Sequence, residues 1–325
     1  MSPLELHLQH QGEPASALSI LSQSTELSNA QLKAAIGKGA LWLEKPTKPS
    51  SDKKNSDKAR ASKKNGGVQR LRRVKKPINA GETLHFYYNE EVLAQAPPAA
   101  QLIDDQQSYS VWFKPSGMLS QGSKWSDHCT ITRWAQLHLP NERPCFLVHR
   151  LDRATCGLIL VAHTKKAAQA FTQLFEQRKL TKQYEAMLDV SQSSLASQVT
   201  INEPIDGKKA ISHFSEIAVD RNRNIGHYLV DIETGRKHQI RKHALMLASP
   251  IIGDRLYNSP HSADGTANTQ AQDKVQMNTA PSFDVDLQLC ATRLAFTCPL
   301  TDKARDYQTP DEFKLSLTAF QSASK

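Results

Sequence analysis

Two short apolar runs, residues 146–148 and 157–162, constrain the fold of this chain more than any other feature. Both are too short for a stable helix, and turn-forming residues bound them, which is typical of buried β-strands. The polar segment between them, residues 149–156, is therefore expected to lie at the edge of a sheet. Four more short apolar or alternating runs predict strands at residues 109–113, 184–190, 227–233 and 287–296.

Helical patterns lie between these strands without a regular order. Residues 130–138 and 239–248 are predicted to be helical, and Thr164 can cap a third helix whose apolar positions follow a 3.6-residue spacing. Because strands and helices do not alternate, we predict an α+β fold. The 325 residues are enough for one large domain and a smaller one.

The first part of the chain, residues 15–93, has the pattern of a small α+β module. A helix is predicted over residues 28–36, with Ser28 as its N-cap. Strands are predicted at residues 40–43 and 83–88.

Two polar insertions and a linker complete the predicted organisation. Residues 46–67 have almost nothing to bury and are predicted to be a disordered insertion in the first module. Residues 94–107 are predicted to be a linker. The larger domain then covers residues 108–325, with a second flexible insertion at residues 258–282.

Positive charge is concentrated in one segment. The net charge is +9 at pH 7, yet residues 45–76 alone contain nine Lys, four Arg and two Asp. That segment therefore carries +11, and the rest of the chain carries −2. Such a block is either a solubilising insertion or a binding segment for a polyanion, and the composition leaves both open.

Several classes of protein are disfavoured by missing patterns. There is no apolar run long enough to cross a bilayer and no secretory leader in the first residues, so a cytoplasmic protein is expected. Five Cys without a CxxC pair indicate neither a disulfide framework nor a zinc site. The twelve His include no HExxH, and His238 and His243 do not share one helical face. We expect no metal and, without a P-loop, GxGxxG or GxSxG motif, no cofactor.

The densest polar cluster is the segment 149–156, where Asp152 lies between Arg150 and Arg153. An Asp beside Arg side chains is expected to be ionised and suited to act as a nucleophile or an electrostatic stabiliser. A structural Asp that caps a turn or closes an ion pair remains the alternative. Tyr184 offers a flat ring for a base, although a core tyrosine fits the same pattern. Further candidate RNA contacts are Arg150, Arg153, Arg236, Lys237, His238, Arg241 and Lys114.

Three long motifs resemble the RluA-type family of RNA pseudouridine synthases. They are HRLDRATCGLILVA (149–162), KQYEAML (182–188) and TGRKHQIRKHALMLASPIIGDRLY (234–257), in this order. The residues 114–117 resemble the opening motif of the family, and residues 289–296 resemble its closing segment. The resemblance covers about residues 108–315. Residues 15–93 are similar, more weakly, to the alpha-L RNA-binding domain that many members carry in front.

The resemblance implies a fold, a reaction and a set of residue roles. The implied fold has a mixed, mainly antiparallel central sheet with flanking helices. The implied reaction isomerises uridine in RNA to pseudouridine without a cofactor. Asp152 matches the catalytic aspartate, and Tyr184 matches the tyrosine that stacks on the base and takes part in the closing proton transfer. Arg241 matches the arginine paired with the aspartate, Arg150 the side chain that fills the gap left by the flipped nucleotide, and Ile240 the apolar wall beside the base.

The chain departs from the family pattern at a few positions. Cys156 replaces the usual Ser, Lys237 replaces the common Thr or Ser, and Asn29 replaces the usual Arg of the small domain. The last departure leaves the RNA affinity of the small domain open.

Two other functions remain to be distinguished. A non-catalytic RNA-binding or ribosome-assembly protein would share the fold and the basic segment, and product formation separates it from an enzyme. A hydrolase of the glycosidic bond usually needs two carboxylates, whereas this cluster has one. We expect a monomer that acts on structured RNA, ribosomal rather than transfer RNA, and does not bind a membrane.

Overall fold

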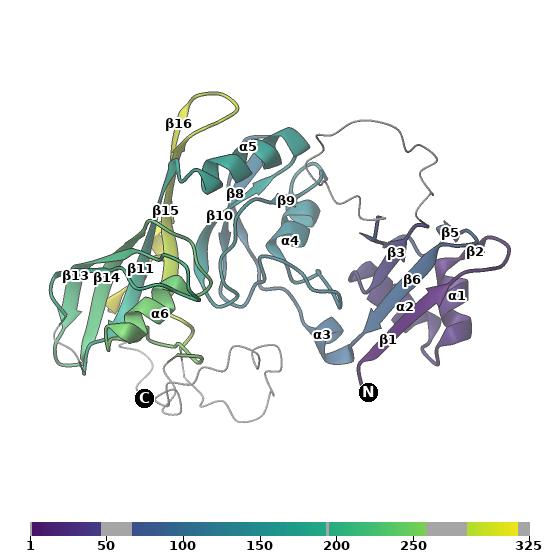
Figure 1. The fold of residues 1–325 in the computed structure, drawn as a ribbon, viewed down its shortest axis with the longest axis horizontal. Helices are drawn as coiled ribbons and strands as arrows, with labels where there is room; N and C mark the ends of the chain where they lie inside the picture. The colour runs from purple at the N-terminus through teal and green to yellow at the C-terminus, as the bar shows by residue number, and fades with distance from the viewer. Residues whose placement is uncertain (1, 47–66, 193–194, 258–284, 318–325) are drawn as a thin grey trace. The chain divides into compact units, whose positions relative to one another are not determined.

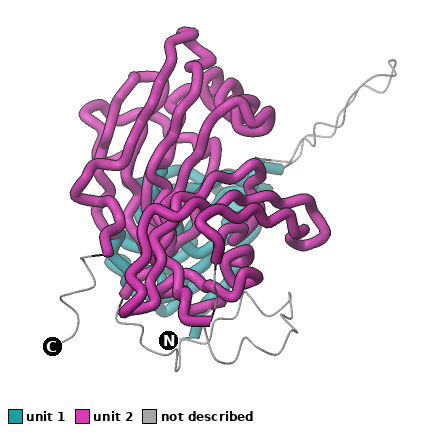
Figure 2. Tube along the Cα trace, turned by 90° about the vertical axis from the view of Figure 1, so that its left-hand side faces the viewer, with its two compact units in different colours: residues 1–97, 121–133 teal, residues 98–120, 134–325 magenta. Residues whose placement is uncertain are grey.

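The computed structural model describes residues 2–46, 67–192, 195–257 and 285–317. These residues form two compact units (Figure 2). Unit 1 comprises residues 1–97 and 121–133, and unit 2 comprises residues 98–120 and 134–325. Most of both predicted insertions, 46–67 and 258–282, lies outside the described residues.

Unit 1 combines a small sheet with short helices. Its elements are β1 (Leu4–Gln9), β2 (Ala15–Ser16), α1 (Ala17–Ser24), α2 (Asn29–Gly37), β3 (Leu41–Glu44), β4 (Gln69–Arg70), β5 (Pro77–Ile78), β6 (Thr83–Tyr88) and α3 (Glu90–Ala94). The main sheet has the strand order β1-β6-β3-β4 and is antiparallel, and β2 pairs separately with β5. Buried side chains from β3 and β6 form one core with those of α1 and α2.

The predicted elements of unit 1 are confirmed, but its extent differs from the prediction. Ser28 caps α2 through a capping box, in which its hydroxyl accepts from the Gln31 backbone N–H and the Gln31 side chain accepts in return. The unit begins before residue 15, because β1 pairs with β6 over its whole length. Residues 121–133 also belong to unit 1, although the larger domain has already begun before them in the sequence.

Unit 2 is built around a ten-stranded sheet (Figure 1). Its strands are β7 (Gln101–Asp105), β8 (Tyr109–Lys114), β9 (Phe146–Leu147), β10 (Cys156–Ala162), β11 (Leu180–Asp189), β12 (Gln198–Ile201), β13 (Ser212–Asp220), β14 (Ile225–Ile232), β15 (Leu289–Thr297) and β16 (Ala304–Gln308). The main path runs β12-β13-β14-β11-β15-β10-β8-β7, and β9 and β16 pair with β10 and β15. Neighbouring strands of this sheet are antiparallel, except β10 and β15, which are parallel.

Three helices and a short 3-10 helix accompany the strands in the described part of unit 2. They are α4 (Ile131–His138), which begins in unit 1, α5 (Lys165–Glu176), α6 (Gln239–Met246) and the 3-10 helix η2 (Asp311–Phe313). Of these, α5 and α6 pack on the sheet. Thr164 caps α5 as predicted, accepting from the Ala167 backbone N–H at 3.0 Å. The apolar face of α5 is buried with Leu158 and Leu160 of β10. This arrangement confirms the predicted α+β class with a mainly antiparallel sheet. No helix of the described segments has the length and apolar character needed to cross a bilayer.

Gly157 lies where β10 and β15 approach each other closely in the centre of this sheet. It has φ +116°, a value that favours glycine, and a Cβ at this position would lie 2.3 Å from the Ala291 carbonyl oxygen. The parallel pairing of β10 with β15 consists of this contact and the neighbouring pair of Cys156 with Cys290. Gly157 therefore permits the close approach that joins the two halves of the sheet beside residues 149–156.

Four strands of unit 2 were not predicted. β7 lies inside the predicted linker, residues 94–107, and pairs with β8. β12, β13 and β16 carry many polar residues on exposed faces, so they lack a clean apolar alternation.

Candidate active site

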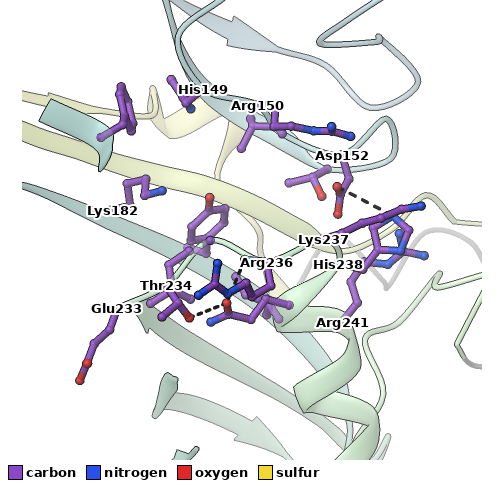
Figure 3. Close-up of a pocket in the computed structure, with 18 of the residues that line it drawn as sticks. His149, Arg150, Asp152, Lys182, Glu233, Thr234, Arg236, Lys237, His238 and Arg241 are labelled. Atoms are coloured by element: carbon purple, nitrogen blue, oxygen red, sulfur yellow. Dashed lines mark hydrogen bonds and ion pairs between the residues drawn. The ribbon is translucent and has the colours of Figure 1, made fainter. Parts of the chain in front are cut away.

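A cavity of about 590 Å³ opens in unit 2 between three segments of the chain. They are residues 149–155, the first part of β11, and residues 232–241 before and within α6. Figure 3 shows side chains from these segments pointing toward one another around the cavity. Of the residues predicted to form the site, eight line it: Arg150, Asp152, Tyr184, Arg236, Lys237, His238, Ile240 and Arg241.

Asp152 is held on a well-anchored loop. The neighbouring Leu151 is buried, and its backbone N–H and carbonyl both bond to the Ser120 hydroxyl, at 3.0 and 2.6 Å. The Thr155 backbone N–H donates to the Asp152 carbonyl at 3.2 Å and closes the turn. The Asp152 carboxylate is 21% exposed, and its nearest cationic candidate is His238, with Nε2 at 3.8 Å. A half-buried carboxylate thus faces the cavity on a loop that backbone and Ser120 hydrogen bonds anchor.

Tyr184 occupies a distortion of the sheet beside the cavity. The register between β11 and β15 shifts between Gln183 and Tyr184, which is the signature of a bulge that can re-aim a side chain. Burial, and then the charge of Asp152, raise the pKa of the Tyr184 hydroxyl. The ring therefore enters the cavity as a neutral phenol that can donate a proton or a hydrogen bond.

Lys182 lies two residues before Tyr184 on the same side of β11 and also lines the cavity. Its ammonium group is 5.5 Å from the centre of the Phe175 ring, and burial lowers the pKa of Lys182. Among the described residues, Lys182 has neither a hydrogen-bond acceptor nor an acidic partner, and burial alone accounts for its lowered pKa. Sequence reasoning missed Lys182 as a site residue, although its spacing from Tyr184 was a usable signal.

His149 supports the cavity without taking part in acid–base chemistry. Its ring stacks on Phe175, with centroids 4.2 Å apart, and its Nε2 accepts from the Leu160 backbone N–H at 2.9 Å. Burial, and then Lys182, lower the pKa of His149 to about 3. The imidazole is therefore neutral and fixed.

Arg241 is engaged differently from the prediction. It was expected to pair with Asp152, but its guanidinium forms a two-bond pair with Asp254, at 2.7 and 2.6 Å. Burial opposes the charge of Arg241, yet the Asp254 bonds outweigh it and raise the pKa of the guanidinium. Asp254 is only 1% exposed, whereas Asp152 is half-buried. A fully buried carboxylate without a cation costs more free energy than a half-buried one, so Arg241 pairs with Asp254. Asp152 acts on Arg241 only at longer range.

Lys114 corrects a second prediction. It was expected to contact RNA, but it is fully buried, and its ammonium donates to the carbonyls of Pro115, Met118 and Arg153. Burial lowers the pKa of Lys114 to about 8. Its role is to join the 115–118 turn to the loop of Asp152.

The other predicted contacts divide by their exposure. Arg150 and Lys237 are exposed, and Ile240 is a buried wall of the cavity. Arg153 is exposed but does not line the cavity, and its Nε donates to the Gly117 carbonyl at 3.2 Å. Arg236 is tied by its Nε to the Lys209 carbonyl at 2.9 Å.

Gln239 orders the loop before α6 and was missed by sequence reasoning. Its side-chain oxygen accepts from the Thr234 hydroxyl at 2.6 Å and from the Arg236 backbone N–H at 3.1 Å. Its amide nitrogen donates to the Ile211 carbonyl at 2.9 Å. Among the described residues, no group of His, Cys, Asp or Glu is arranged to hold a metal ion.

Comparisons with known proteins agree on one family. The family model for RNA pseudouridylate synthase matches residues 108–245. The dual-specificity RNA pseudouridine synthase RluA of Salmonella typhimurium is 32% identical over 216 residues, which are 62% of this chain and 88% of that protein. Ribosomal large subunit pseudouridine synthase D of Buchnera aphidicola subsp. Schizaphis graminum is 27% identical over 202 residues, 56% of this chain and 62% of that protein. An uncharacterized RNA pseudouridine synthase of Mycoplasma pneumoniae is also 27% identical, and the match spans 55% of this chain and 64% of its own length.

A solved structure supports the same assignment at the level of the fold. Human RNA pseudouridylate synthase domain containing 1 matches 67% of this chain and 87% of its own chain with a TM-score of 0.50 and 21% identity. The fold predicted from the resemblance is thereby confirmed. With a relative at 32% identity that is matched over 88% of its length, the chain belongs to the RluA-type family of RNA pseudouridine synthases.

Proposed function

We propose that this protein isomerises specific uridines in structured RNA to pseudouridine. The observation that carries the proposal is that Asp152 and Tyr184 meet in one cavity with Arg150 and Ile240, on a chain of this family. The cavity, about 590 Å³, falls within the usual range for sites that bind small ligands.

The proposed reaction needs no change of oxidation state. The bond from the ribose C1′ to the uracil N1 breaks, and a bond from C1′ to C5 forms. The proton on C5 leaves, and N1 gains one, so substrate and product are isomers. The Asp152 carboxylate attacks the sugar or the base, or assists deprotonation of the sugar. In the closing step the neutral Tyr184 donates its proton to N1, and the phenolate so formed accepts the proton that leaves C5.

Access of the uracil to Asp152 requires the nucleotide to leave its stack. Flipping a base costs a few kcal/mol, and stacking on an aromatic ring offsets part of that cost. Tyr184 offers the ring, Ile240 the apolar wall, and the exposed Arg150 can enter the gap in the RNA.

Unit 1 is proposed to contribute to RNA binding. Its exposed segment around Arg73 and Lys75 is basic, and Arg72 and Lys76 are half-buried beside them. Ribosomal RNA is the proposed substrate over transfer RNA, since one relative named above is described as a large-subunit pseudouridine synthase. We further propose that the protein acts as a cytoplasmic monomer without a cofactor.

The proposal is tested with transcripts of large-subunit ribosomal RNA that carry tritium at C5 of uridine. Purified wild-type protein should release tritium to water, because the C5 proton leaves in the reaction. Binding of the transcript without release would instead identify a non-catalytic RNA-binding protein. Carbodiimide mapping of pseudouridine in cells with and without the gene then locates the modified position.

Tyr184→Phe should lower turnover while RNA affinity changes little. Phe keeps the aromatic face for stacking but removes the hydroxyl, so the loss should appear in kcat, by about 10- to 100-fold, as for other proton-transfer groups. Single-turnover tritium release and filter binding measure the two effects. Equal turnover of variant and wild type would exclude a proton-transfer role.

Lys182→Met should raise stability and weaken RNA binding. Burial lowers the pKa of Lys182 in the folded state, so folding disfavours the charged ammonium. This loss of folding stability is complete at pH values below the lowered pKa. It fades as the pH rises through the lowered pKa toward the ordinary lysine pKa. Removing the charge should raise the Tm by a few degrees at pH 7, which corresponds to about 1 kcal/mol. If the ammonium meets a phosphate, the slope of log affinity against log salt falls by about one. The exposed Lys303→Met is the control, and an unchanged salt slope for Lys182→Met contradicts the phosphate contact.

A further inference from the structure

His238 has an unusual backbone conformation immediately before α6. It is the residue before the helix, and its φ of +55° lies in the left-handed region, which few non-glycine residues adopt. Its side chain makes no capping bond to the helix. The ring instead lies next to Asp152, with Nε2 3.8 Å from the Asp152 carboxylate (Figure 3).

The other side of the His238 ring is held by Tyr257. The Tyr257 hydroxyl is 2.9 Å from Nδ1 of His238, and the two rings meet edge to face with centroids 5.7 Å apart. One imidazole therefore contacts a phenol with one nitrogen and faces the candidate catalytic carboxylate with the other.

The turn that carries Tyr257 is built around Asp254. One Asp254 oxygen accepts from the backbone N–H groups of Leu256 and Tyr257, both at 3.0 Å, and from Arg241. The Arg241 guanidinium also lies 5.0 Å above the Tyr257 ring. Arg241 and Asp254 thus fix the turn that presents Tyr257 to His238.

The protonation states of His238 and Tyr257 favour one tautomer of the His238 ring. Burial lowers the pKa of His238, Arg241 and Lys237 lower it further, and Asp152 and Asp254 oppose them. The ring is therefore neutral near pH 7. Burial raises the pKa of Tyr257 to about 12, against the effect of Arg241, so its hydroxyl keeps its proton. A Tyr257 hydroxyl that donates to Nδ1 leaves the ring proton on Nε2, directed at Asp152.

We infer that His238 is a positioning residue for Asp152, set in its tautomer by Tyr257, and that its Nε2–H closes on the carboxylate when RNA fills the cavity. This inference rests on the proposed function. It gives His238 a role other than the RNA contact expected from the sequence. Tyr257 and Asp254 then act indirectly, by holding His238 in place. The approach from 3.8 Å to a hydrogen bond needs a movement of about 1 Å, and a displacement of that size in a reacting group can cost about 100-fold in rate.

The test compares His238→Ala, His238→Gln and Tyr257→Phe with wild type on the tritiated ribosomal transcript. His238→Ala should lower kcat by about 30- to 100-fold with KM for RNA within about twofold, since orientation and not binding is lost. His238→Gln keeps an N–H donor and should recover at least part of the loss. Tyr257→Phe should lower kcat by about 10-fold, an effect typical of partners that fix a histidine tautomer. His213→Gln, on β13 and outside the cavity, is the matched control.

A spectroscopic measurement on the RNA-free protein separates this inference from the proposed function. Nitrogen-15 spectra of labelled histidine should show His238 neutral with its proton on Nε2, a mixed tautomer in Tyr257→Phe, and a shifted Nε2 signal in Asp152→Asn. A raised KM with unchanged kcat in His238→Ala would make His238 an RNA contact and overturn the inference, as would a proton on Nδ1. Absence of tritium release by the wild type would count against the proposed function alone, because the tautomer is read without any substrate.

Discussion

Asp152→Asn should abolish pseudouridine formation and leave the folded protein and its RNA binding nearly unchanged. Asn has almost the same shape, but it has no negative charge and is a poor nucleophile, so the reaction loses the group on which bond breaking depends. The loop around it should survive, because its anchors are the Ser120 hydroxyl and backbone groups and not the Asp152 carboxylate. We expect tritium release to fall by more than about 100-fold, as expected when a reacting group is removed.

The same variant can be checked in cells and in vitro. A strain complemented with Asp152→Asn should lack the pseudouridines that the wild-type gene restores. Glu142→Gln removes an exposed carboxylate of unit 2 and should retain full activity. Activity of Asp152→Asn above about a hundredth of wild type would rule out the nucleophile role.

Arg241→Met should destabilise the protein by about 3 to 5 kcal/mol, because it leaves the Asp254 carboxylate buried without its cation. The double variant Arg241→Met, Asp254→Leu replaces the pair by apolar side chains and should recover most of this loss. Part of the turn will still be weakened, since Asp254 also accepts from the backbone N–H groups of Leu256 and Tyr257.

Urea unfolding of the RNA-free protein measures this coupling directly. The exposed pair Arg293 and Asp306 provides a control, and its equivalent single variants should lower the stability far less than Arg241→Met does, because water screens an exposed ion pair. A cost below about 1 kcal/mol for Arg241→Met would mean that Asp254 is neutral or solvated, contrary to its burial.

Local patterns were sufficient to predict much of the fold. The caps at Ser28 and Thr164 need only neighbouring residues, and both are formed as predicted. The alternation in β11 and β14 is also a local signal, because one face of each strand is buried. β16 escaped prediction because its residues are mostly polar and its place in the sheet depends on pairing with β15.

The sequence predicted those site residues that lie close together in one segment. It did not predict the partners that depend on how deeply each side chain is buried. Asp152 and Arg150 stand in one segment, and both line the cavity. Arg241 pairs with Asp254, 13 residues away, because Asp254 is the more deeply buried acid, and burial cannot be read from spacing. Lys114 looks like a surface cation in the sequence, yet three backbone carbonyls from two loops enclose it.

The position of β15 has a consequence for how the protein is made. This strand, Leu289–Thr297, lies between β10 and β11 in the sheet, although it follows them by about a hundred residues in the chain. During synthesis the N-terminal parts of a chain emerge first, so the loop of Asp152 and the strand of Tyr184 leave the ribosome without the strand that joins them. Competence for the reaction should therefore arise only after residues 289–297 have left the ribosome. A nascent chain stalled before residue 289 should hold its Asp and its Tyr on two parts of the sheet that no strand yet joins.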